Sequence, residues 1–213
     1  MADPGYGGME YACALGGAAP ANWQSDPLFE GLEPATEYAF YARYAGNAFY
    51  NGATSDGAAI ATANYRVSYV DAGGTQLRTP ADVNVVRLTP AMIDGTDRDG
   101  TLAGGWYVVE EDMIIERRIA VSGDVHLILA NGVDLNCRDG IGVEAGNSLT
   151  VYGQTDDIDD AGVLRAKGSG SDAAIGGSSG HDAGDITFES GVVMARGVAS
   201  PAIGAALAQA SVL

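Results

Sequence analysis

Four carboxylates lie within five consecutive positions, at Asp156, Asp157, Asp159 and Asp160. Repulsion between carboxylates this close is relieved by solvent or by Ca²⁺, an ion that binds several oxygen ligands. These four aspartates are therefore candidate calcium ligands. A solvated acidic loop is the alternative interpretation of the same residues.

The histidines His126 and His181 are the side chains that could move a proton near neutral pH. His126 lies at the start of an expected strand, where a partly exposed strand residue is the plain interpretation. His181 and Asp182 adjoin in a glycine-rich loop and could form an acid/base pair. No serine or cysteine at a nucleophile elbow accompanies them, so the sequence assigns no catalytic residue.

Two other segments match ion-binding loops only in part. An EF-hand loop has oxygen ligands at its first, third and fifth positions and glycine at its sixth. The segment that begins at Asp94 fails at the third and sixth positions, so it is interpreted as a solvated loop. Gly168, Gly170 and Asp172 match part of a calcium-binding nonapeptide, but that motif works by repetition and occurs once.

Aromatic side chains are the groups that could contact the faces of sugar rings. Trp106, Tyr107 and Tyr152 are the candidate carbohydrate-binding residues. Tyr152 alternates with Leu149 and Val151, so we expect it to face away from the core. The alternative for Trp106 is that it closes the apolar end of the region that begins at Gly105.

The strongly negative charge of the chain disfavours the binding of negatively charged partners. The formal net charge is −17 and the pI is about 4.1. Such a chain repels nucleic-acid phosphates and anionic membrane surfaces, so neither is an expected partner. No apolar run reaches the length of about 18 residues that a membrane span needs. Cys13 and Cys137 are too few for a disulfide framework and are expected to be unpaired and partly buried.

Short apolar strands separated by glycines recur in the C-terminal half. Each of three strand–glycine–strand phrases is followed by an Ile-Gly pair. The pairs are Ile141-Gly142, Ile175-Gly176 and Ile203-Gly204. This recurrence is typical of a β-solenoid, in which each coil covers the apolar side of the next. We expect a right-handed parallel β-helix of three to four coils over residues 105–213, truncated at its C-terminus.

Alternation within these strands predicts the core, and the fold class is all-β. The predicted inward residues are Leu127, Leu129, Val133, Leu135, Leu149, Val151, Val163, Ile186, Phe188, Val192 and Met194. Of these, Leu127, Leu149 and Ile186 should occupy one position in successive coils. We expect a corner at residues 122–124 and inserted loops at residues 155–161 and 168–184.

The N-terminal part has a different pattern. Residues 1–63 are predicted to form one unit with strands at residues 10–15, 37–45 and 57–62. Residues 64–104 are predicted to be a linker with a hairpin. Its turn is expected at residues 71–74, a cluster of aspartate and glycine. A loop rich in aspartate and glycine is expected from Thr89 to Gly104.

The segment from Trp23 to Arg43 resembles the second half of a fibronectin type III-like domain. The most diagnostic phrase is Leu32-x-Pro34-x-Thr36-x-Tyr38. Such domains have about seven strands in about 100 residues. The resemblance therefore implies a partial β-sandwich that lacks its opening strands, cut from a longer exported chain.

Residues 105–204 resemble the parallel β-helix repeat region of bacterial cell-surface proteins, some of them described as carbohydrate-binding-domain proteins. The phrases that carry this resemblance are residues 105–109, 121–129 and 146–154. The resemblance implies an extracellular or cell wall-attached location. It also implies host or bacterial glycans, or other surface proteins, as partners.

Three functions remain open from the sequence. The leading hypothesis is non-catalytic adhesion or carbohydrate binding. The second is a β-helix polysaccharide lyase or hydrolase, because some lyases of this fold hold Ca²⁺ with aspartates and use a basic residue to abstract a proton. Arg165 and Lys167 follow the acidic segment closely enough for that role. The third is a structural spacer without a ligand.

Overall fold

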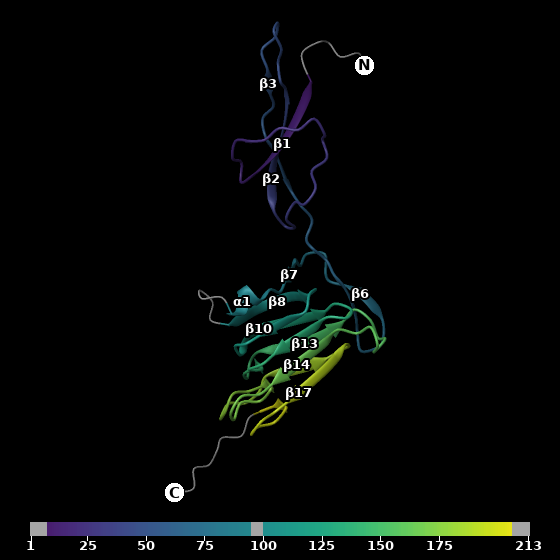
Figure 1. Ribbon diagram of the computed structural model, residues 1–213, viewed down its shortest axis with the longest axis vertical. Helices are drawn as coiled ribbons and strands as arrows, with labels where there is room; N and C mark the ends of the chain where they lie inside the picture. The colour runs from purple at the N-terminus through teal and green to yellow at the C-terminus, as the bar shows by residue number, and fades with distance from the viewer. Residues whose placement is uncertain (1–7, 95–99, 206–213) are drawn as a thin grey trace. The chain divides into compact units, whose positions relative to one another are not determined.

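The computed structural model describes residues 8–94 and 100–205 of the chain. The chain forms two compact units, Met1–Tyr65 and Arg66–Leu213 (Figure 1). The regular secondary structure of the described residues is almost entirely strand, and the fold class is all-β as predicted. Most of the segment that was expected to be a linker, residues 64–104, belongs to the second unit.

The first unit contains one antiparallel sheet among its described residues. The strands are β1 (Met9–Leu15), β2 (Glu37–Tyr44), β3 (Ala53–Thr54) and β4 (Ala58–Ala61). β2 is central, because it pairs with each of the other three. No second sheet is observed in the described part of this unit, so the second layer that a sandwich requires is not found there.

The phrase that ends at Tyr38 builds a hydrogen-bonded corner at the start of β2. The backbone N–H of Glu33 donates to the Tyr38 hydroxyl at 3.0 Å, and the Thr36 hydroxyl donates to the Pro34 carbonyl at 2.8 Å. Tyr38 is buried. These two hydrogen bonds fix how the loop enters the sheet. A tyrosine hydroxyl bonded to the backbone a few residues upstream is also a feature of immunoglobulin-like sandwiches.

The second unit is built from parallel strands in three ladders, which we number here. The first ladder contains β7 (Val85–Arg87), β8 (Thr101–Val109), β10 (Ile119–Leu129), β13 (Ser148–Gly153) and β16 (Asp185–Phe188). The second ladder contains β9 (Met113–Ile115), β11 (Asp134–Cys137), β14 (Val163–Lys167) and β17 (Val192–Arg196). The third ladder contains the start of β10, β12 (Ile141–Gly142), β15 (Ile175–Gly176) and β18 (Ile203–Gly204).

Each turn of the chain adds one strand to each ladder in the same order. In the first ladder Leu149 pairs with Ile186, as predicted. Leu127 pairs with Val151 and not with Leu149. The predicted alignment was therefore wrong by two residues. A shift of two keeps the same side chains inward, because side chains in a strand alternate with a period of two.

β10 runs without a break from the third ladder into the first. Its register with β8 shifts between Ser122 and Val125, which is a β-bulge. Gly123 has a φ of 88°, and a Cβ on Gly104 would lie 3.2 Å from the Asp124 nitrogen. The corner predicted at residues 122–124 is thus a bulge, where the chain bends while its strand continues.

The core lies inside the three ladders. The prediction is confirmed for six buried residues, namely Leu127, Leu129, Val133, Leu135, Leu149 and Val151. Ile186 is half-buried and packs against this core. Phe188 remains 37% exposed, because it lies on β16, the last strand described in the first ladder.

The predicted inward positions of β14 and β17 are wrong. Val163 pairs with Asp134 and Val192, so these residues share the outer side of the second ladder. Leu164 is fully buried in their place. The residue after the glycine was expected to face inward in every coil. A shift of one residue reverses every side chain of a strand, so Met194 also faces outward.

The first coil is closed by the short helix α1 (Pro90–Asp94) and by Leu88, two residues before it. Ile93 is fully buried, and Leu88 is 4% exposed; both belong to the core. Proline suits the first turn of a helix because its missing N–H would be unpaired there. The loop predicted from Thr89 to Gly104 is therefore wrong in part, since it contains this helix and the start of β8.

Arg118 lies at the corner between the second and third ladders, where it joins successive turns. Its guanidinium donates to four backbone carbonyls, those of Asp139, Ile141, Ala173 and Gly176, at 2.8–3.4 Å. Burial lowers the pKa of Arg118, and nearby carboxylates oppose that shift. A Cβ on Gly140 would lie 2.5 Å from the Ala174 carbonyl oxygen, so this corner requires close backbone approach.

Candidate functional site

The outer side of the first ladder carries two of the three predicted carbohydrate-binding residues. Trp106 and Tyr152 face outward there, together with His126, which pairs with Trp106 on the neighbouring strand. Trp106 therefore does not plug the first coil. Tyr107 faces the core, where its hydroxyl donates to the Ala103 carbonyl at 2.9 Å. The three aromatic residues do not share one surface.

A hairpin covers this aromatic surface. It consists of β5 (Ser68–Val70) and β6 (Gln76–Arg78), joined by the predicted turn. The ring centroid of Tyr69 lies 5.4 Å from that of Trp106 and 4.7 Å from that of Tyr152. The Trp106 and His126 rings stack at 4.1 Å. The rings thus pack against one another and leave Tyr152 only 9% exposed.

A second apolar layer lies beneath the hairpin, outside the main core. Its buried members are Val67, Val70, Val85, Val108 and Ile128. Because both sides of β10 are buried, its sequence is apolar at nearly every position from Val125 to Leu129, a pattern typical of parallel strands. The inner side of the first ladder therefore packs against the main core, and its outer side packs against the hairpin.

Hydrogen bonds from a later turn hold the hairpin in place. The Ala72 N–H donates to Glu189 Oε2 at 2.8 Å, and the Ser190 hydroxyl donates to the Val70 carbonyl at 2.5 Å. Burial raises the pKa of Tyr69, with a further contribution from Asp71 and Glu189. The cover is thus anchored by polar contacts at its turn and by aromatic packing at its centre.

Asp124, His126 and Tyr152 form a line of polar contacts beside the rings. The imidazole Nε2 lies 3.2 Å from Asp124 Oδ2, and Nδ1 lies 3.1 Å from the Tyr152 hydroxyl. A hydrogen bond from the Ser148 hydroxyl, with a smaller contribution from His126, lowers the pKa of Asp124. Burial, with the nearby Tyr69 and Glu189, raises the pKa of Tyr152 to about 12.

This arrangement is better suited to holding the rings than to proton transfer. Both nitrogens of His126 are engaged and its ring face is stacked on Trp106. Tyr152 is protonated at neutral pH, as an ordinary tyrosine is, and burial raises its pKa further from that range. A general base needs a free nitrogen or oxygen within reach of the proton it removes, and neither residue offers one. His181 and Asp182 are both exposed in a turn elsewhere.

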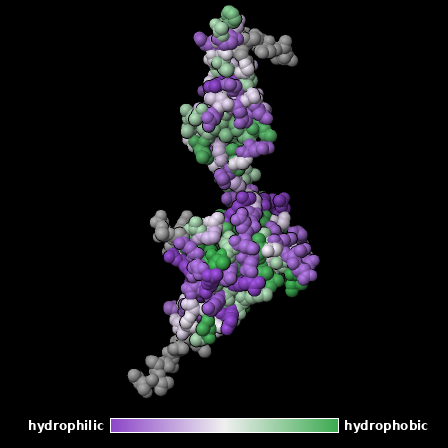
Figure 2. All heavy atoms as spheres, viewed as in Figure 1, coloured by the Kyte–Doolittle hydropathy of each residue, from purple (hydrophilic) through white to green (hydrophobic). Residues whose placement is uncertain are grey.

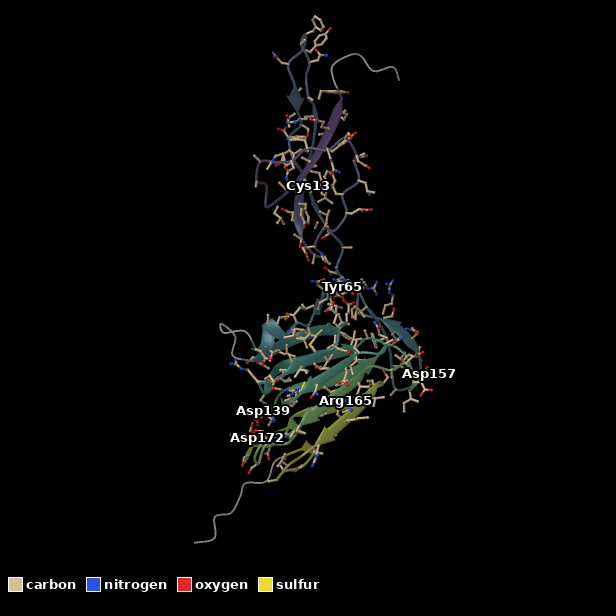
Figure 3. All side chains as sticks on the ribbon, viewed as in Figure 1. Cys13, Tyr65, Asp139, Asp157, Arg165 and Asp172 are labelled. Atoms are coloured by element: carbon tan, nitrogen blue, oxygen red, sulfur yellow. The ribbon has the colours of Figure 1, made fainter. Side chains whose placement is uncertain are left out.

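The acidic segment forms an exposed turn between β13 and β14, as predicted for an inserted loop. Asp156 lines a pocket of about 250 Å³ together with Asp71 and Glu189. Asp157 lies at the opposite edge of the unit from Asp139 (Figure 3). Within residues 8–94 and 100–205, no group of three or more His, Cys, Asp or Glu side chains is arranged to hold a metal ion. Calcium binding by this segment stays a prediction.

The two cysteines lie in different units and are both free. Cys13 is half-buried on β1, whereas Cys137 is buried in the core of the second unit. Burial raises the pKa of the Cys137 thiol to about 12. The thiolate is the reactive form of cysteine, so Cys137 is a packing residue and not a nucleophile.

The outer side of the second ladder is open. Ile114, Asn136, Arg165 and Met194 follow one another there in register. Ile114 is 47% exposed and Met194 is 50% exposed, so no described segment covers this face. Its first two strands border a groove of about 490 Å³, lined by Pro90, Asp112, Met113, Ile114, Asp134 and Asn136. Figure 2 shows polar residues over much of the visible face of this unit.

Ion pairs join neighbouring strands on this open face. Arg165 donates to Asp134 at 2.7 Å, and Arg138 donates to Glu116 at 2.6 Å. Figure 3 labels Arg165 near the middle of the second unit. The Asp134 N–H donates to Asp112 Oδ1 at 2.8 Å. The open face therefore offers carboxylates, an amide and guanidinium groups beside exposed apolar side chains.

This open face was not predicted from the sequence, although one residue of β14 indicates it. Val163 was predicted to face inward, and Arg165 has the same parity in the strand. That assignment would have buried a guanidinium in an apolar core, which is costly without a partner. The conflict at Arg165 indicates the opposite facing for β14, and with it an outer surface on the second ladder.

Comparisons with known proteins leave the family open. No protein-family model matches the chain, and neither a curated protein nor a solved structure is significantly similar to it. None of the described helices is long and apolar enough to span a membrane.

Proposed function

We propose that this chain is part of a non-catalytic cell-surface protein that binds carbohydrate through the outer side of the second ladder. The observation that carries the proposal is the open face in which Asn136, Asp134 and Arg165 lie beside Ile114 and the groove. Ligand sites combine a few directed polar groups with apolar surface, and sugars present hydroxyls and C–H faces that suit both.

The architecture that supports this role is a short parallel β-helix preceded by a fibronectin type III-like unit. The three parallel ladders support the first assignment. The hydrogen bond between the Glu33 N–H and the Tyr38 hydroxyl supports the second. Both architectures present rigid surfaces, which suits an adhesive role outside the cell, in the extracellular space or attached to the wall. A signal for export in the parent reading frame is the expected companion.

The experiment is a glycan array probed with the wild-type protein and three variants. Asn136→Ala should weaken binding by roughly fivefold, the worth of about one hydrogen bond. Asn51→Ala, on the first unit, is the matched control and should bind as the wild type does. Tyr152→Ala separates the two faces, because its ring lies beneath the hairpin of the first ladder.

A loss of binding with Tyr152→Ala but not with Asn136→Ala would move the site to the aromatic surface. If the wild type binds no glycan on the array, the proposed carbohydrate binding is contradicted and a structural spacer without a ligand is favoured. Both variants need a thermal midpoint close to that of the wild type, so that a loss of binding is not a loss of folding.

Polysaccharide hydrolysis is the second candidate, because Asp112 and Asp134 line the same groove. Glycoside hydrolysis requires two carboxyl groups that flank one sugar bond. If the groove is catalytic, the wild type should release reducing ends from a bound glycan, and Asp112→Asn should abolish that release. Binding without release in both proteins is the result expected for the non-catalytic role.

A further inference from the structure

We infer that a row of cations on the second ladder, Arg138, Lys167 and Arg196, binds a linear, negatively charged polysaccharide. This inference rests on the carbohydrate-binding function proposed above and specifies the class of sugar. The row runs across the strands, so an extended chain would lie along the direction in which the coils stack. Each strand would then present one cation to a successive part of the ligand.

The distribution of charge in the second half of the chain sets this row apart. From residue 119 onward the only lysines and arginines are Arg138, Arg165, Lys167 and Arg196. All four lie on the second ladder or directly after one of its strands. The same region has twelve acidic residues, of which Asp134 lies on the second ladder and Asp139 directly follows Arg138. Of the other ten, four lie in the exposed turn at residues 156–160 and the rest lie on the first ladder or in loops. In a chain with a formal charge of −17, the cations after residue 119 thus share one ladder.

The register places like charges side by side. Lys167 pairs with Arg196 on the next strand. Arg138 directly follows Cys137, which pairs with Ala166, the residue before Lys167. Neighbouring strands are about 4.8 Å apart. Like charges directly opposite each other on neighbouring strands are destabilising, so this arrangement costs stability unless an anion lies between them.

The protein itself neutralises only part of the row. Arg138 is paired with Glu116, and the neighbouring Arg165 is paired with Asp134. No carboxylate in the described parts of the chain forms an ion pair with Lys167 or Arg196, and both side chains are exposed. These two residues therefore provide the uncompensated positive charge, next to the hydrogen-bonding groups of the open face.

Charge density favours a polysaccharide over a nucleic acid as the occupant. The net charge of the whole chain repels any polyanion at long range. Beyond about 8 Å this repulsion is screened at physiological ionic strength, so a local row can still bind an anion. A carbohydrate with one carboxylate per sugar suits a few separate cations and keeps hydroxyls for Asn136. The phosphates of a nucleic acid are denser and need more cations than this row has.

The test compares binding to immobilised polygalacturonate, a linear carboxylated polysaccharide, with binding to neutral dextran. The variant Lys167→Gln/Arg196→Gln should bind polygalacturonate about three- to tenfold more weakly than the wild type, as expected for the loss of two exposed charges. The control Arg78→Gln/Arg87→Gln changes the net charge equally, at exposed positions on β6 and β7 outside the second ladder, and should bind as the wild type does. Wild-type binding should fall as NaCl is raised from 50 to 500 mM.

The thermal midpoint of Lys167→Gln/Arg196→Gln should equal or exceed that of the wild type, because a like-charge pair is removed. Equal polygalacturonate binding by both double variants would overturn the inference and leave Arg196 as a charge that protects the edge of β17 from pairing. Equal binding of the wild type to single-stranded DNA would overturn the assignment to carbohydrate. Binding of neutral glycans alone on the array would leave the proposed function standing and remove this inference.

Discussion

At the scale of single residues, Arg118 shows how one side chain can donate hydrogen bonds to backbone carbonyls of two successive turns. Short strands of two residues, such as β12 and β15, offer few backbone hydrogen bonds of their own. The guanidinium supplies donors to carbonyls of both turns at 2.8–3.4 Å. Arginine suits this position because it has five N–H donors in a fixed geometry.

Arg118→Ala should lower the free energy of unfolding by about 2–3 kcal/mol, because it removes charge-assisted hydrogen bonds and leaves carbonyls unpaired. The measurement is a urea titration followed by circular dichroism. Arg78→Ala removes an exposed arginine of the hairpin and should change the free energy by less than about 0.5 kcal/mol. Equal midpoints for the two variants would contradict the role given to Arg118.

Tyr152 gives a prediction about pH. Burial raises its pKa to about 12, above the ordinary tyrosine value of 10.0. A group whose folded-state pKa is raised contributes its full stability below the unfolded pKa and loses it as the pH rises toward the folded pKa. Stability should therefore decline between pH 10 and 12 in part because of Tyr152.

The check is the thermal midpoint measured at pH 8 and at pH 11 in the wild type and in Tyr152→Phe. The phenylalanine has no proton to lose, so the fall in midpoint over this range should be smaller in the variant. Tyr107 and Tyr69, whose pKa values are also raised, contribute equally in both proteins. A fall of the same size in both would show that Tyr152 does not contribute.

At the scale of elements, the facing of a strand is decided by its hydrogen-bonding register. β14 pairs with β11 so that Leu164 is opposite Leu135, and both are fully buried. Val163 and Arg165 then lie on the outer side, where Arg165 reaches Asp134. The same register places β17 with Val193 inward.

Leu164→Ala should lower the free energy of unfolding by about 2–5 kcal/mol, because it leaves a cavity in the core. Val163→Ala, one residue away, should lower it by less than about 1 kcal/mol, because Val163 is only half-buried on the outer side. Chemical denaturation of both variants measures the difference. The opposite order of stability would mean that the strand faces the other way.

The hairpin is a second example at this scale. Its alternation predicted two strands and a turn, and both strands form. Its position over Trp106 and Tyr152 could not be predicted, because the contacts join residues far apart in the sequence. The aromatic residues predicted to meet a sugar meet Tyr69 instead.

At the scale of the whole molecule, the chain contains two units with separate sheets. The second unit has its own core, from Leu88 to Ile175, and its own closing helix. In stacked coils each turn contacts chiefly its neighbours, so stability is approximately a sum over adjacent turns.

Residues 66–213 expressed alone should therefore fold, with a strand-rich circular dichroism spectrum and a cooperative thermal transition. The matched comparison is residues 100–213, which lack the hairpin, Leu88 and Ile93. This shorter piece should melt at a lower temperature, because its outer apolar layer and first coil are uncovered. A piece 66–213 without a cooperative transition would show that the second unit depends on the first.

Most of the strands were predictable from the sequence because alternation and glycine spacing are local properties. The bounds of β1, β2 and β13 follow from period-two patterns. The short helix α1 was missed because a five-residue helix has too little periodicity to detect. The aromatic candidates were identified by type alone, and residue type does not specify what covers a side chain.

The sequence by itself determined that the chain is all-β, that its second half repeats, and that Ile-Gly pairs such as Ile141-Gly142 recur at equivalent places. These properties depend on the order of neighbouring residues, since alternation and turn formation are local. Only the tertiary structure decided which side of β14 is buried, that Tyr69 covers Trp106, and that Lys167 lies beside Arg196. The physical reason is that register and covering are set by contacts between distant segments, whose free energy depends on all the partners together.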